Sequence, residues 1–173
     1  MYKKNYPSKR FKHTIEFLKS NVSNSESILD LGIENALTNV MQQHGYSVKN
    51  TKGEDLDMDT STITNSNADV VTAFEILEHL ISPFTVLKDI KANKLVASIP
   101  LRLWFSSAYR SKTDLWDRHF HEFEDWQFDW LLEKAGWKII DRKKWTNPTK
   151  KIGFRPILRW FTPRYYIVYA ERV

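Results

Sequence analysis

The sequence predicts an α/β fold in which helices cover both faces of a mostly parallel sheet. Apolar runs of strand length alternate along the chain with segments that have helical periodicity. The first of these runs, Ser27–Leu31, ends in an acid and a glycine, and a helix-like segment follows. Gly45 and Gly136 stand where two helical patterns end. Strands separated by single helices run parallel, because each helix crosses over one face of the sheet.

The amino-terminal part of the chain alternates helix and strand twice. Phe11, Ile15 and Leu18 are spaced to form one apolar helix face, and Gly45 closes the next helix. We expect a loop at residues 55–67, which are acidic and rich in Ser and Thr. The elements expected before that loop are a helix at Phe11–Ser20, a strand at Ser27–Leu31, a helix at Ala36–His44 and a strand at Tyr46–Asn50.

The rest of the chain begins with a run of β-branched and small residues, which is typical of a buried strand. Pro83 suits the first turn of a helix, and Pro100 stops a later strand. The expected elements are strands at Asp69–Phe74, Lys94–Ile99, Trp137–Asp141 and Tyr165–Glu171, and helices at Ser82–Ile90 and Trp126–Lys134.

The series has no internal repeat and no linker, so we expect one domain over residues 1–173. Within it, residues 1–26 form an N-terminal helical segment, and residues 142–164 form a basic, aromatic insertion before the last strand. An apolar content of 42% and an aromatic content of 14% argue against disorder. The chain has no cysteine, which excludes a disulfide framework and a thiolate metal site. It shows neither a signal peptide nor an apolar run of membrane-spanning length, and we expect a cytoplasmic protein.

The net charge of +5 is unevenly distributed. Lys138–Arg164 holds nine Lys or Arg residues and a single acid, Asp141. Glu54–Asp69 holds five acids and no Lys or Arg. This asymmetry favours an acidic rim for a cationic group and a basic face for an anionic partner, although either segment can also be an ordinary solvated surface. The aromatic residues among the cations leave open a nucleic acid, a phosphorylated small molecule or a membrane surface as that partner.

Four sequence motifs carry a family resemblance: Ile28–Gly32 (ILDLG), Asp69–Leu80 (DVVTAFEILEHL), Leu95–Pro100 (LVASIP) and Leu131–Trp137 (LLEKAGW). In this order, over residues 27–141, the chain resembles the class I S-adenosylmethionine-dependent methyltransferases of the small methyltransferase-domain type. The resemblance implies a three-layer, Rossmann-like sheet with an antiparallel last strand. The stretch from Asp30 to Asp69 is short for that family, so we expect its third strand to be abbreviated or lacking. Only Asp30 and Gly32 remain of the family's glycine-rich loop.

The loop after the first strand separates this family from other nucleotide-binding folds. A phosphate-binding loop needs bare backbone N–H groups at a helix N-terminus, and a neighbouring carboxylate repels the phosphate. Glu34 stands in that position, which disfavours NAD and ATP. S-Adenosylmethionine has no phosphate and carries a sulfonium and an ammonium group, so carboxylates at the strand ends suit it. The expected cofactor is therefore S-adenosylmethionine.

The resemblance implies cofactor-binding roles for residues at two strand ends. Asp30 and Gly32 would shape the loop beside the methionine end of the cofactor, although a purely structural role for Asp30 is equally open. Phe74 and Glu75 would line the same end from the neighbouring strand.

The segment Gly53–Asp57 resembles the acidic turn that the family places at the adenine, with Asp55 and Leu56 as the expected contacts. The family's ribose-binding acid falls near Lys49–Lys52, which is not acidic, so Glu54 and Asp55 are the nearest candidates for that role. For Asp55 the alternative is an ordinary solvated loop.

Three histidines are candidates for a general base or for orienting the acceptor: His79, His119 and His121. Methyl transfer is an in-line displacement that depends mainly on positioning, so a base helps only with a hydroxyl or protonated amine acceptor. Local hydrogen bonding is the alternative for all three. His119 and His121 alternate with Phe120 and Glu122, so they would share one face if this segment is extended. With Glu122 they form only a weak metal-binding pattern at their loop spacing, and we expect no metal.

Together these features predict methyl transfer from S-adenosylmethionine to a small-molecule, lipid or saccharide acceptor, which the basic segment suggests is anionic. The alternative is a binding or regulatory protein that keeps the fold and has lost efficient cofactor binding. Nucleic acid or a membrane surface, contacted through Lys138–Arg164, is a further but less favoured partner.

Overall fold

The computed structural model describes residues 8–149 and 151–173, so that the start of the predicted N-terminal segment and Lys150 lie outside it. The described residues form one six-stranded sheet in the order β2-β1-β3-β4-β6-β5. The first four strands in this order are parallel to one another, and β6 is antiparallel to both β4 and β5. The strands are β1 (Ser27–Asp30), β2 (Ser47–Asn50), β3 (Val70–Phe74), β4 (Lys94–Pro100), β5 (Trp137–Thr146) and β6 (Pro163–Arg172).

The predicted fold class is confirmed, including the lacking third strand. Within the described residues β2 is an edge strand, paired only with β1. The chain between β2 and β3 contains a single short helix, α3 (Ser61–Thr64), where we expected only loop. On the β2 side the sheet therefore has one strand fewer than the family's sheet, and this edge lies beside the loop that follows β1.

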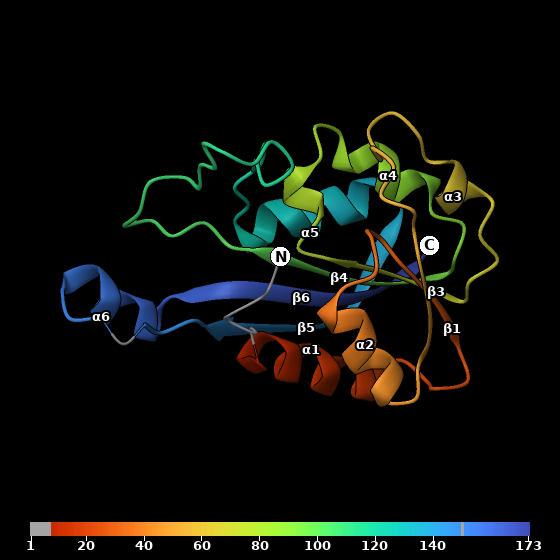
Figure 1. Cartoon of the computed structure of the whole chain (residues 1–173), viewed down its shortest axis with the longest axis horizontal. Helices are drawn as coiled ribbons and strands as arrows, with labels where there is room; N and C mark the ends of the chain where they lie inside the picture. The colour runs from red at the N-terminus through yellow and green to blue at the C-terminus, as the bar shows by residue number, and fades with distance from the viewer. Residues whose placement is uncertain (1–7, 150) are drawn as a thin grey trace.

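Helices cover both faces of the sheet, as Figure 1 shows. One face carries α1 (Ser8–Asn21) and α2 (Ala36–Gln43), and the other carries α4 (Pro83–Asp89) and α5 (Asp125–Lys134). Two buried clusters correspond to these two faces, because alternate residues of a strand point in opposite directions. Val70 thus packs with α1 and α2, whereas Val71 packs with α4 and α5.

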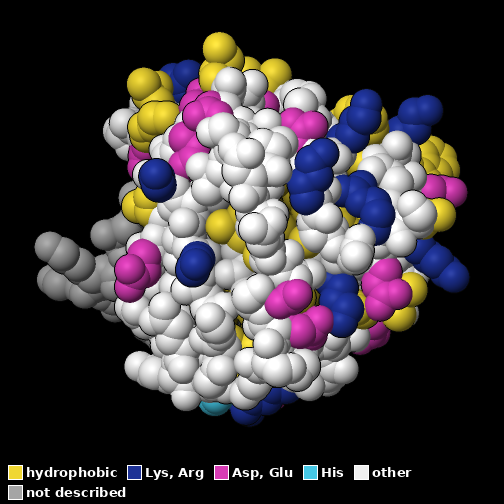
Figure 2. All heavy atoms as spheres, turned by 90° about the vertical axis from the view of Figure 1, so that its right-hand side faces the viewer, with side chains coloured by type: hydrophobic (Ala, Val, Ile, Leu, Met, Phe, Trp, Pro, Cys, Tyr) yellow, Lys and Arg dark blue, Asp and Glu magenta, His cyan; other side chains and the backbone are white. Residues whose placement is uncertain are grey.

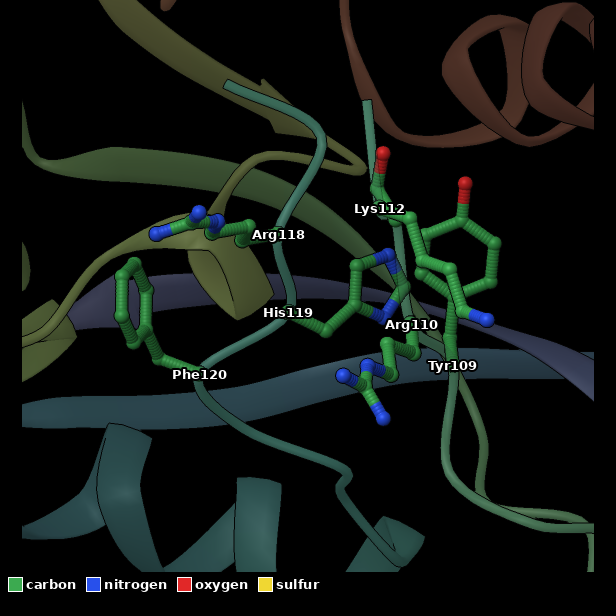
Figure 3. Close-up of a pocket in the computed structure, with 7 residues that line it drawn as sticks. Tyr109, Arg110, Lys112, Arg118, His119 and Phe120 are labelled. Carbon is green, nitrogen blue, oxygen red and sulfur yellow. The ribbon is translucent and has the colours of Figure 1, made fainter. Parts of the chain in front are cut away.

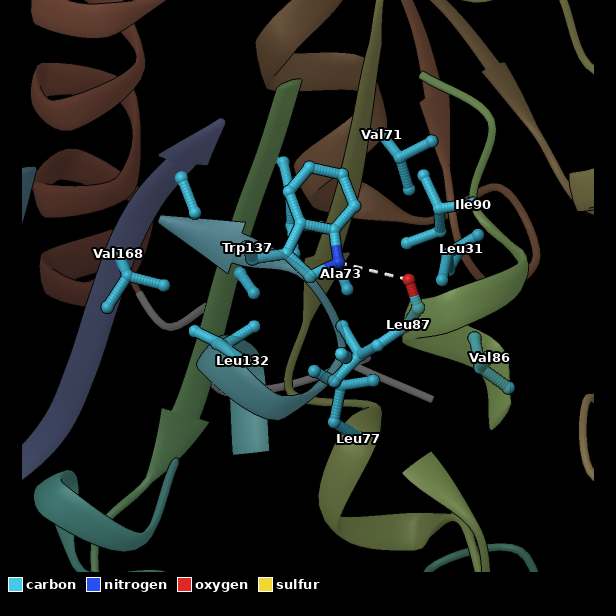
Figure 4. Close-up of a cluster of buried hydrophobic side chains, with 14 of the residues drawn as sticks. Leu31, Val71, Ala73, Leu77, Val86, Leu87, Ile90, Leu132, Trp137 and Val168 are labelled. Atoms are coloured by element: carbon cyan, nitrogen blue, oxygen red, sulfur yellow. Dashed lines mark hydrogen bonds between the residues drawn. The ribbon is translucent and has the colours of Figure 1, made fainter. Parts of the chain in front are cut away.

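Trp137 is the largest fully buried side chain and lies at the start of β5. Its indole Nε1–H donates to the carbonyl oxygen of Leu87 at 3.0 Å, which joins β5 to α4 (Figure 4). The Arg172 guanidinium lies 4.0 Å from the ring centroid of Trp137. A buried indole needs a partner for its N–H, and here the end of α4 supplies one.

The carboxyl-terminal part of the chain differs most from the expectation. β5 extends to Thr146 rather than Asp141, because it pairs along β6, with Trp145 stacked on Tyr165 at a centroid distance of 5.5 Å. The predicted insertion at 142–164 therefore begins inside a strand. It also contains a helix that we did not predict, α6 (Phe154–Phe161), which lies at the far end of the β5–β6 pair in Figure 1.

Charge is mixed at the opposite end of the molecule. Figure 2 shows that end, where Lys and Arg side chains alternate with Asp and Glu side chains over the visible face. Among the described residues, no helix is both long and apolar enough to cross a membrane.

Candidate functional site at the carboxyl edge of the sheet

Asp30, the last residue of β1, is 2% exposed and holds three strand ends together. Its carboxylate accepts hydrogen bonds from the Thr72 hydroxyl at 2.6 Å and from the Asn50 side-chain amide at 3.1 Å. Burial raises the pKa of Asp30 to about 6, against the lowering effect of these hydrogen bonds. The geometry gives Asp30 a clear structural role at the base of the loop.

Gly32 forms the turn that follows, with φ at +107°, where side chains other than glycine are strained. Its N–H donates to the Thr51 hydroxyl at 2.8 Å, and its carbonyl oxygen accepts from the Asn50 amide at 3.1 Å. Asn35 then caps α2 with its side chain. These bonds come from within the protein, so the loop keeps its shape with a single glycine.

In the acidic segment after β2, Glu54 keeps one carboxylate oxygen without a partner in the described part of the chain, whereas Asp57 bonds to the start of α4. One carboxylate oxygen of Glu54 accepts the Lys52 N–H at 2.7 Å, whereas the other is buried and has no hydrogen-bond partner among the described residues. Asp57 accepts the N–H groups of Ile81 and Ser82, each at 2.8 Å, and so connects this segment to the start of α4.

The two other predicted residues of this segment differ in exposure. Asp55 is exposed and accepts the N–H of Asp57 at 3.0 Å. Leu56 is buried in the core, so any ligand contact from it would come from its backbone.

Glu75 occupies the end of β3 with φ at +53°, an uncommon value for a residue other than glycine. Its side chain is only 14% exposed and accepts from the Ser98 hydroxyl at 2.9 Å, while Arg10 of α1 lies 3.3 Å away. Burial raises the pKa of Glu75, and the Arg10 charge opposes that shift. The preceding residue, Phe74, packs against the cluster that contains α1. A carboxylate is thus fixed at the sheet edge next to the Gly32 loop.

His79 and His119 lie together, although 39 other residues separate them in the sequence. Their ring centroids are 4.7 Å apart, edge to face. The Nδ1 atom of His79 lies 3.0 Å from the Arg118 carbonyl oxygen, which accepts its proton. Burial and then the neighbouring His79 lower the pKa of His119, so that its imidazole is neutral near pH 7.

Glu78 completes this group of side chains. It is 1% exposed, and burial raises the pKa of its carboxyl well above the ordinary value. Its main-chain carbonyl oxygen accepts the N–H groups of Phe120 and His121 at 2.9 and 3.2 Å. This backbone contact holds the histidine-bearing segment over the end of β3.

His121 does not join His79 and His119. Its Nε2 lies 3.2 Å from the carbonyl oxygen of Ile81, and its ring stacks on Phe123 at a centroid distance of 5.3 Å. The structure therefore separates the two histidines that the sequence suggested would share a face.

A pocket of about 570 Å³ lies beside His119 and is lined by Tyr109, Arg110, Ser111, Lys112, Arg118, His119 and Phe120. In Figure 3 the His119 imidazole points toward Tyr109 and Arg110, whereas Arg118 and Phe120 project to the other side of the backbone. No acid among the described residues forms an ion pair with the three cations of the lining. The pocket is therefore suited to an anionic molecule.

The sequence pointed to His119 but not to Arg110, Ser111 or Lys112 as part of a pocket. The signal that could have found them is the local run of cations after the β4 strand, at a place where this fold positions its loops at the carboxyl edge.

The residues at the sheet edge fit a cofactor that carries positive charge and lacks phosphate. Residues 31–38, which form the loop and the start of α2, contain Glu34 and no Lys or Arg. The carboxylates of Glu54 and Glu75 stand on either side of this loop, and one oxygen of Glu54 has no partner among the described residues. Carboxylates of this kind can accept from hydroxyl and ammonium groups and would repel a phosphate.

Comparisons with known proteins support the fold. No protein-family model matches the sequence, and no curated protein matches it either. Several solved structures do match in shape, all at low sequence identity. A putative S-adenosylmethionine-dependent methyltransferase from Listeria monocytogenes is 13% identical with a TM-score of 0.60, over 95% of this chain and 98% of that one.

Two further structures extend the comparison. Magnesium protoporphyrin IX methyltransferase (ChlM) from Synechocystis PCC 6803, with S-adenosylmethionine bound, is 11% identical with a TM-score of 0.61, over 95% of this chain and 79% of that one. The [4+2]-cyclase SpnF is 13% identical with a TM-score of 0.60, over 98% of this chain and 84% of that one. At these identities the likeness shows the fold alone, and that fold is the one found in class I methyltransferases.

Proposed function

We propose that this protein transfers a methyl group from S-adenosylmethionine to an anionic acceptor. The observation that carries the proposal is the adjacency of two unlike sites at one sheet edge. An edge rich in carboxylates borders the Gly32 loop, and a cationic pocket lies beyond the end of β3. In open α/β sheets, ligands bind at this carboxyl edge, where the strand order reverses. Here the reversal lies between β1 and β3.

The cofactor would be held by the loop after β1 and by acids on both sides of it. Gly32 allows close approach of the backbone, Glu75 faces the methionine end, and Glu54 offers an oxygen for the ribose hydroxyls. Asp55 stays an exposed candidate for the adenine side, to which Leu56 could contribute only its backbone. S-Adenosylmethionine supplies a methyl group already activated by its sulfonium. The protein then has to position the acceptor and exclude water.

The acceptor would enter the pocket beside His119. Arg110 and Lys112 provide positive charge, and Tyr109 provides an aromatic face. An acceptor with a carboxylate or phosphate group fits this lining, because the cations have no acidic partner among the described residues and gain one on binding.

His119 is the best-placed candidate base among the three histidines. It lines the pocket, and its lowered pKa keeps a lone pair available near pH 7. The His79 ring packs edge to face against the His119 ring, whereas His121 contacts Ile81 and Phe123 instead. His119 would thus take a proton from an acceptor hydroxyl or ammonium group.

The alternative is a protein that keeps the fold without methyl transfer. The resemblance of the chain to the [4+2]-cyclase SpnF makes this alternative concrete, since that protein is named for a different reaction. Such a protein would bind its small molecule in the cationic pocket without using the Gly32 loop.

The two possibilities differ in a labelling experiment. The protein is incubated with S-adenosylmethionine labelled in its methyl group and with fractions of small anionic metabolites and lipids, and the label is followed into product. We expect transfer that falls at least tenfold in the Arg110→Gln/Lys112→Gln variant and stays unchanged in the Lys88→Gln control on α4, which is exposed and remote from the pocket. Transfer to a neutral acceptor that both variants catalyse equally would contradict an anionic acceptor, and no transfer to any fraction would favour the non-catalytic alternative.

A further inference from the structure

Glu78, His79 and His119 form a group of metal-ligating side chains at the inner side of the pocket. One ligand atom from each lies within 4.8 Å of the other two. Glu78 is buried, and its Oε2 atom has no hydrogen-bond partner among the described residues. An isolated buried carboxylate is unfavourable unless it is neutralised, paired or bound to a cation. The described part of the chain thus places a buried carboxylate with an unsatisfied oxygen beside two imidazoles.

The orientation of His79 is the second observation. Its Nδ1–H donates to the Arg118 carbonyl oxygen, so the neutral ring carries its lone pair on Nε2. That Nε2 atom lies 3.7 Å from the Oε1 atom of Glu78. Metal-binding histidines are usually held in this way, with the non-ligating nitrogen bound to a carbonyl or carboxylate oxygen.

The backbone fixes the third ligand in place. The carbonyl oxygen of Glu78 accepts two N–H groups from the segment that follows His119, and the Tyr109 ring packs on the His119 imidazole at 4.5 Å. Since His119 also lines the pocket, a cation in this group would face the pocket on its open side. The ion would take the His119 lone pair, so the role of general base proposed for His119 belongs to the metal-free protein.

We propose that Glu78, His79 and His119 bind a divalent transition-metal ion of the Zn²⁺ type. Two imidazole nitrogens and one carboxylate oxygen suit Zn²⁺, Co²⁺ or Mn²⁺ better than Mg²⁺ or Ca²⁺, which prefer oxygen ligands throughout. Nitrogen ligands of one tetrahedral Zn²⁺ lie roughly 3.4 Å apart, so small side-chain rotations close the present group around the ion. The fourth position would be left for water or for an oxygen of the bound molecule.

The test is metal binding by the whole chain, without any activity measurement. Equilibrium dialysis against buffered Zn²⁺ gives the stoichiometry, and Co²⁺ substitution gives the visible absorption of a tetrahedral site. We expect one ion per chain. We also expect affinity to fall at least tenfold in Glu78→Gln and in His119→Ala, and to stay unchanged in His121→Ala, which alters a histidine of the same segment that the group does not use.

Two outcomes would overturn the metal site. The first is a wild-type protein that retains no more Zn²⁺ than the His79→Ala/His119→Ala double variant. The second is an equal loss of binding in His121→Ala, which would place the ion elsewhere. Circular dichroism verifies that each variant is folded, and His119 lies in the irregular segment between β4 and α5, where a substitution leaves the helices and strands intact.

A separate observation concerns α6. No residue of this helix is buried, and five large apolar side chains at or beside it are exposed: Ile152, Phe154, Ile157, Trp160 and Phe161. The helical residues among them recur three, six and seven positions after Phe154 and therefore share one face. Arg155 and Arg159 lie one turn apart beside that face.

The sequence on both sides of α6 is basic. Residues 147–170 contain five Lys or Arg and no acid, whereas Arg142, Lys143 and Lys144 of β5 before them are paired with acids of other elements. In Figure 1 the helix lies at the tip of the β5–β6 pair, away from the rest of the sheet, and the segment 101–124 projects toward the same end. That segment adds further exposed apolar side chains, among them Trp104, Leu115 and Trp116.

We infer that α6 and its flanks bind the surface of an anionic lipid bilayer. An exposed apolar helix face with cations beside it is the pattern of an interfacial helix, which buries its apolar side at the headgroup boundary. The aliphatic Ile152 and Ile157 favour lipid over nucleic acid, because they offer neither charge to a phosphate nor a ring for base stacking.

Vesicle sedimentation tests this surface. We expect binding to vesicles that contain phosphatidylglycerol and little binding to vesicles of phosphatidylcholine alone. The Ile157→Ser/Trp160→Ser variant should bind the anionic vesicles at least tenfold more weakly, and the Trp130→Ser control should bind them as the wild type does, since Trp130 is an equally exposed tryptophan on α5. Tighter binding to a single-stranded oligonucleotide than to anionic vesicles, or vesicle binding that the double variant keeps, would overturn the inference.

Discussion

The two sides of the sheet edge differ in how their polar groups are satisfied. On the β1–β2 side, Asp30, Gly32, Asn50 and Thr51 bond to one another and to Thr72, and the Glu54 oxygen that finds no partner within residues 8–149 and 151–173 lies outside this frame, in the segment after β2. On the β3–β4 side, Glu78 has an oxygen without a partner among the described residues, and the pocket cations form no ion pair with a described acid, although Asp117 and Glu122 bond to Tyr109 at the same pocket. The first side gives the site its shape, and the second keeps chemical groups available for a ligand. Mutation on the first side is therefore expected to change mainly the stability of the protein, and mutation on the second side mainly its binding of a ligand.

The largest expected effect is on the Asp30 side and depends on pH. The folded protein raises the pKa of Asp30 from 3.8 to about 6, so the charged form is disfavoured by folding. This penalty is absent below pH 4, grows between pH 4 and pH 6 and is complete above pH 6, where it amounts to about 3 kcal/mol. Asp30→Asn removes the titration. Urea unfolding at several pH values should show the unfolding free energy of the variant rising by about that amount relative to the wild type between pH 4 and pH 7.

A constant difference between Asp30→Asn and the wild type over that pH range would contradict this account. Any loss of a hydrogen bond in the variant appears as an offset that does not change with pH, so it does not obscure the trend.

A smaller loss is expected at Asp57, which joins the acidic segment to α4. Asp57→Ala leaves the N–H groups of Ile81 and Ser82 without their acceptor, and we expect the unfolding free energy to fall by about 1–2 kcal/mol. Asp55→Ala is the matched control, because that exposed carboxylate accepts one local N–H, and its loss should change stability by less than about 0.5 kcal/mol. Equal losses in both variants would show that Asp57 does not tie the segment to α4.

The smallest expected effect lies on the β3–β4 side and is a gain in stability, opposite to the loss expected at Asp57. Glu78→Gln removes a buried carboxylate whose pKa is raised well above its ordinary value by burial. In metal-free buffer at pH 8 we expect the variant to be more stable than the wild type by about 1 kcal/mol. Chemical denaturation measures the difference. A variant less stable than the wild type under these conditions would mean that the Glu78 carboxylate is stabilised by a partner in the folded protein, against the contrast drawn between the two sides.

Much of the fold follows from local sequence patterns. The bounds of strands β1, β3 and β4 and of helix α2 were predicted to within one or two residues, because apolar periodicity and capping glycines act locally. The extension of β5 was not predicted. Arg142, Lys143 and Lys144 do not form an apolar strand pattern, and they adopt strand structure because they pair with β6. Helix α6 was missed because it has only eight residues and contains Pro156.

The candidate site was only partly predictable. Asp30 and Gly32 stand at a strand end that the sequence reveals, whereas the contact of His79 with His119 depends on how a long segment folds back over β3. The grouping of His119 with His121 was an inference from alternation, and the structure gives these residues different partners. Arg110 and Lys112 belong to a run of cations that the sequence shows after β4, but only the fold of that segment brings them beside His119.

The most direct test of the central proposal is calorimetric titration with S-adenosylhomocysteine, the product form of the cofactor. We predict saturable binding of one molecule per chain that is abolished by Gly32→Asp, since a side chain at φ +107° strains the loop and adds a charge beside it. Gly136→Ala, at a comparable φ of +87° away from the site, is the control for backbone strain and should bind normally. No binding at millimolar ligand, or equal binding by Gly32→Asp, would contradict the assignment of this sheet edge to S-adenosylmethionine.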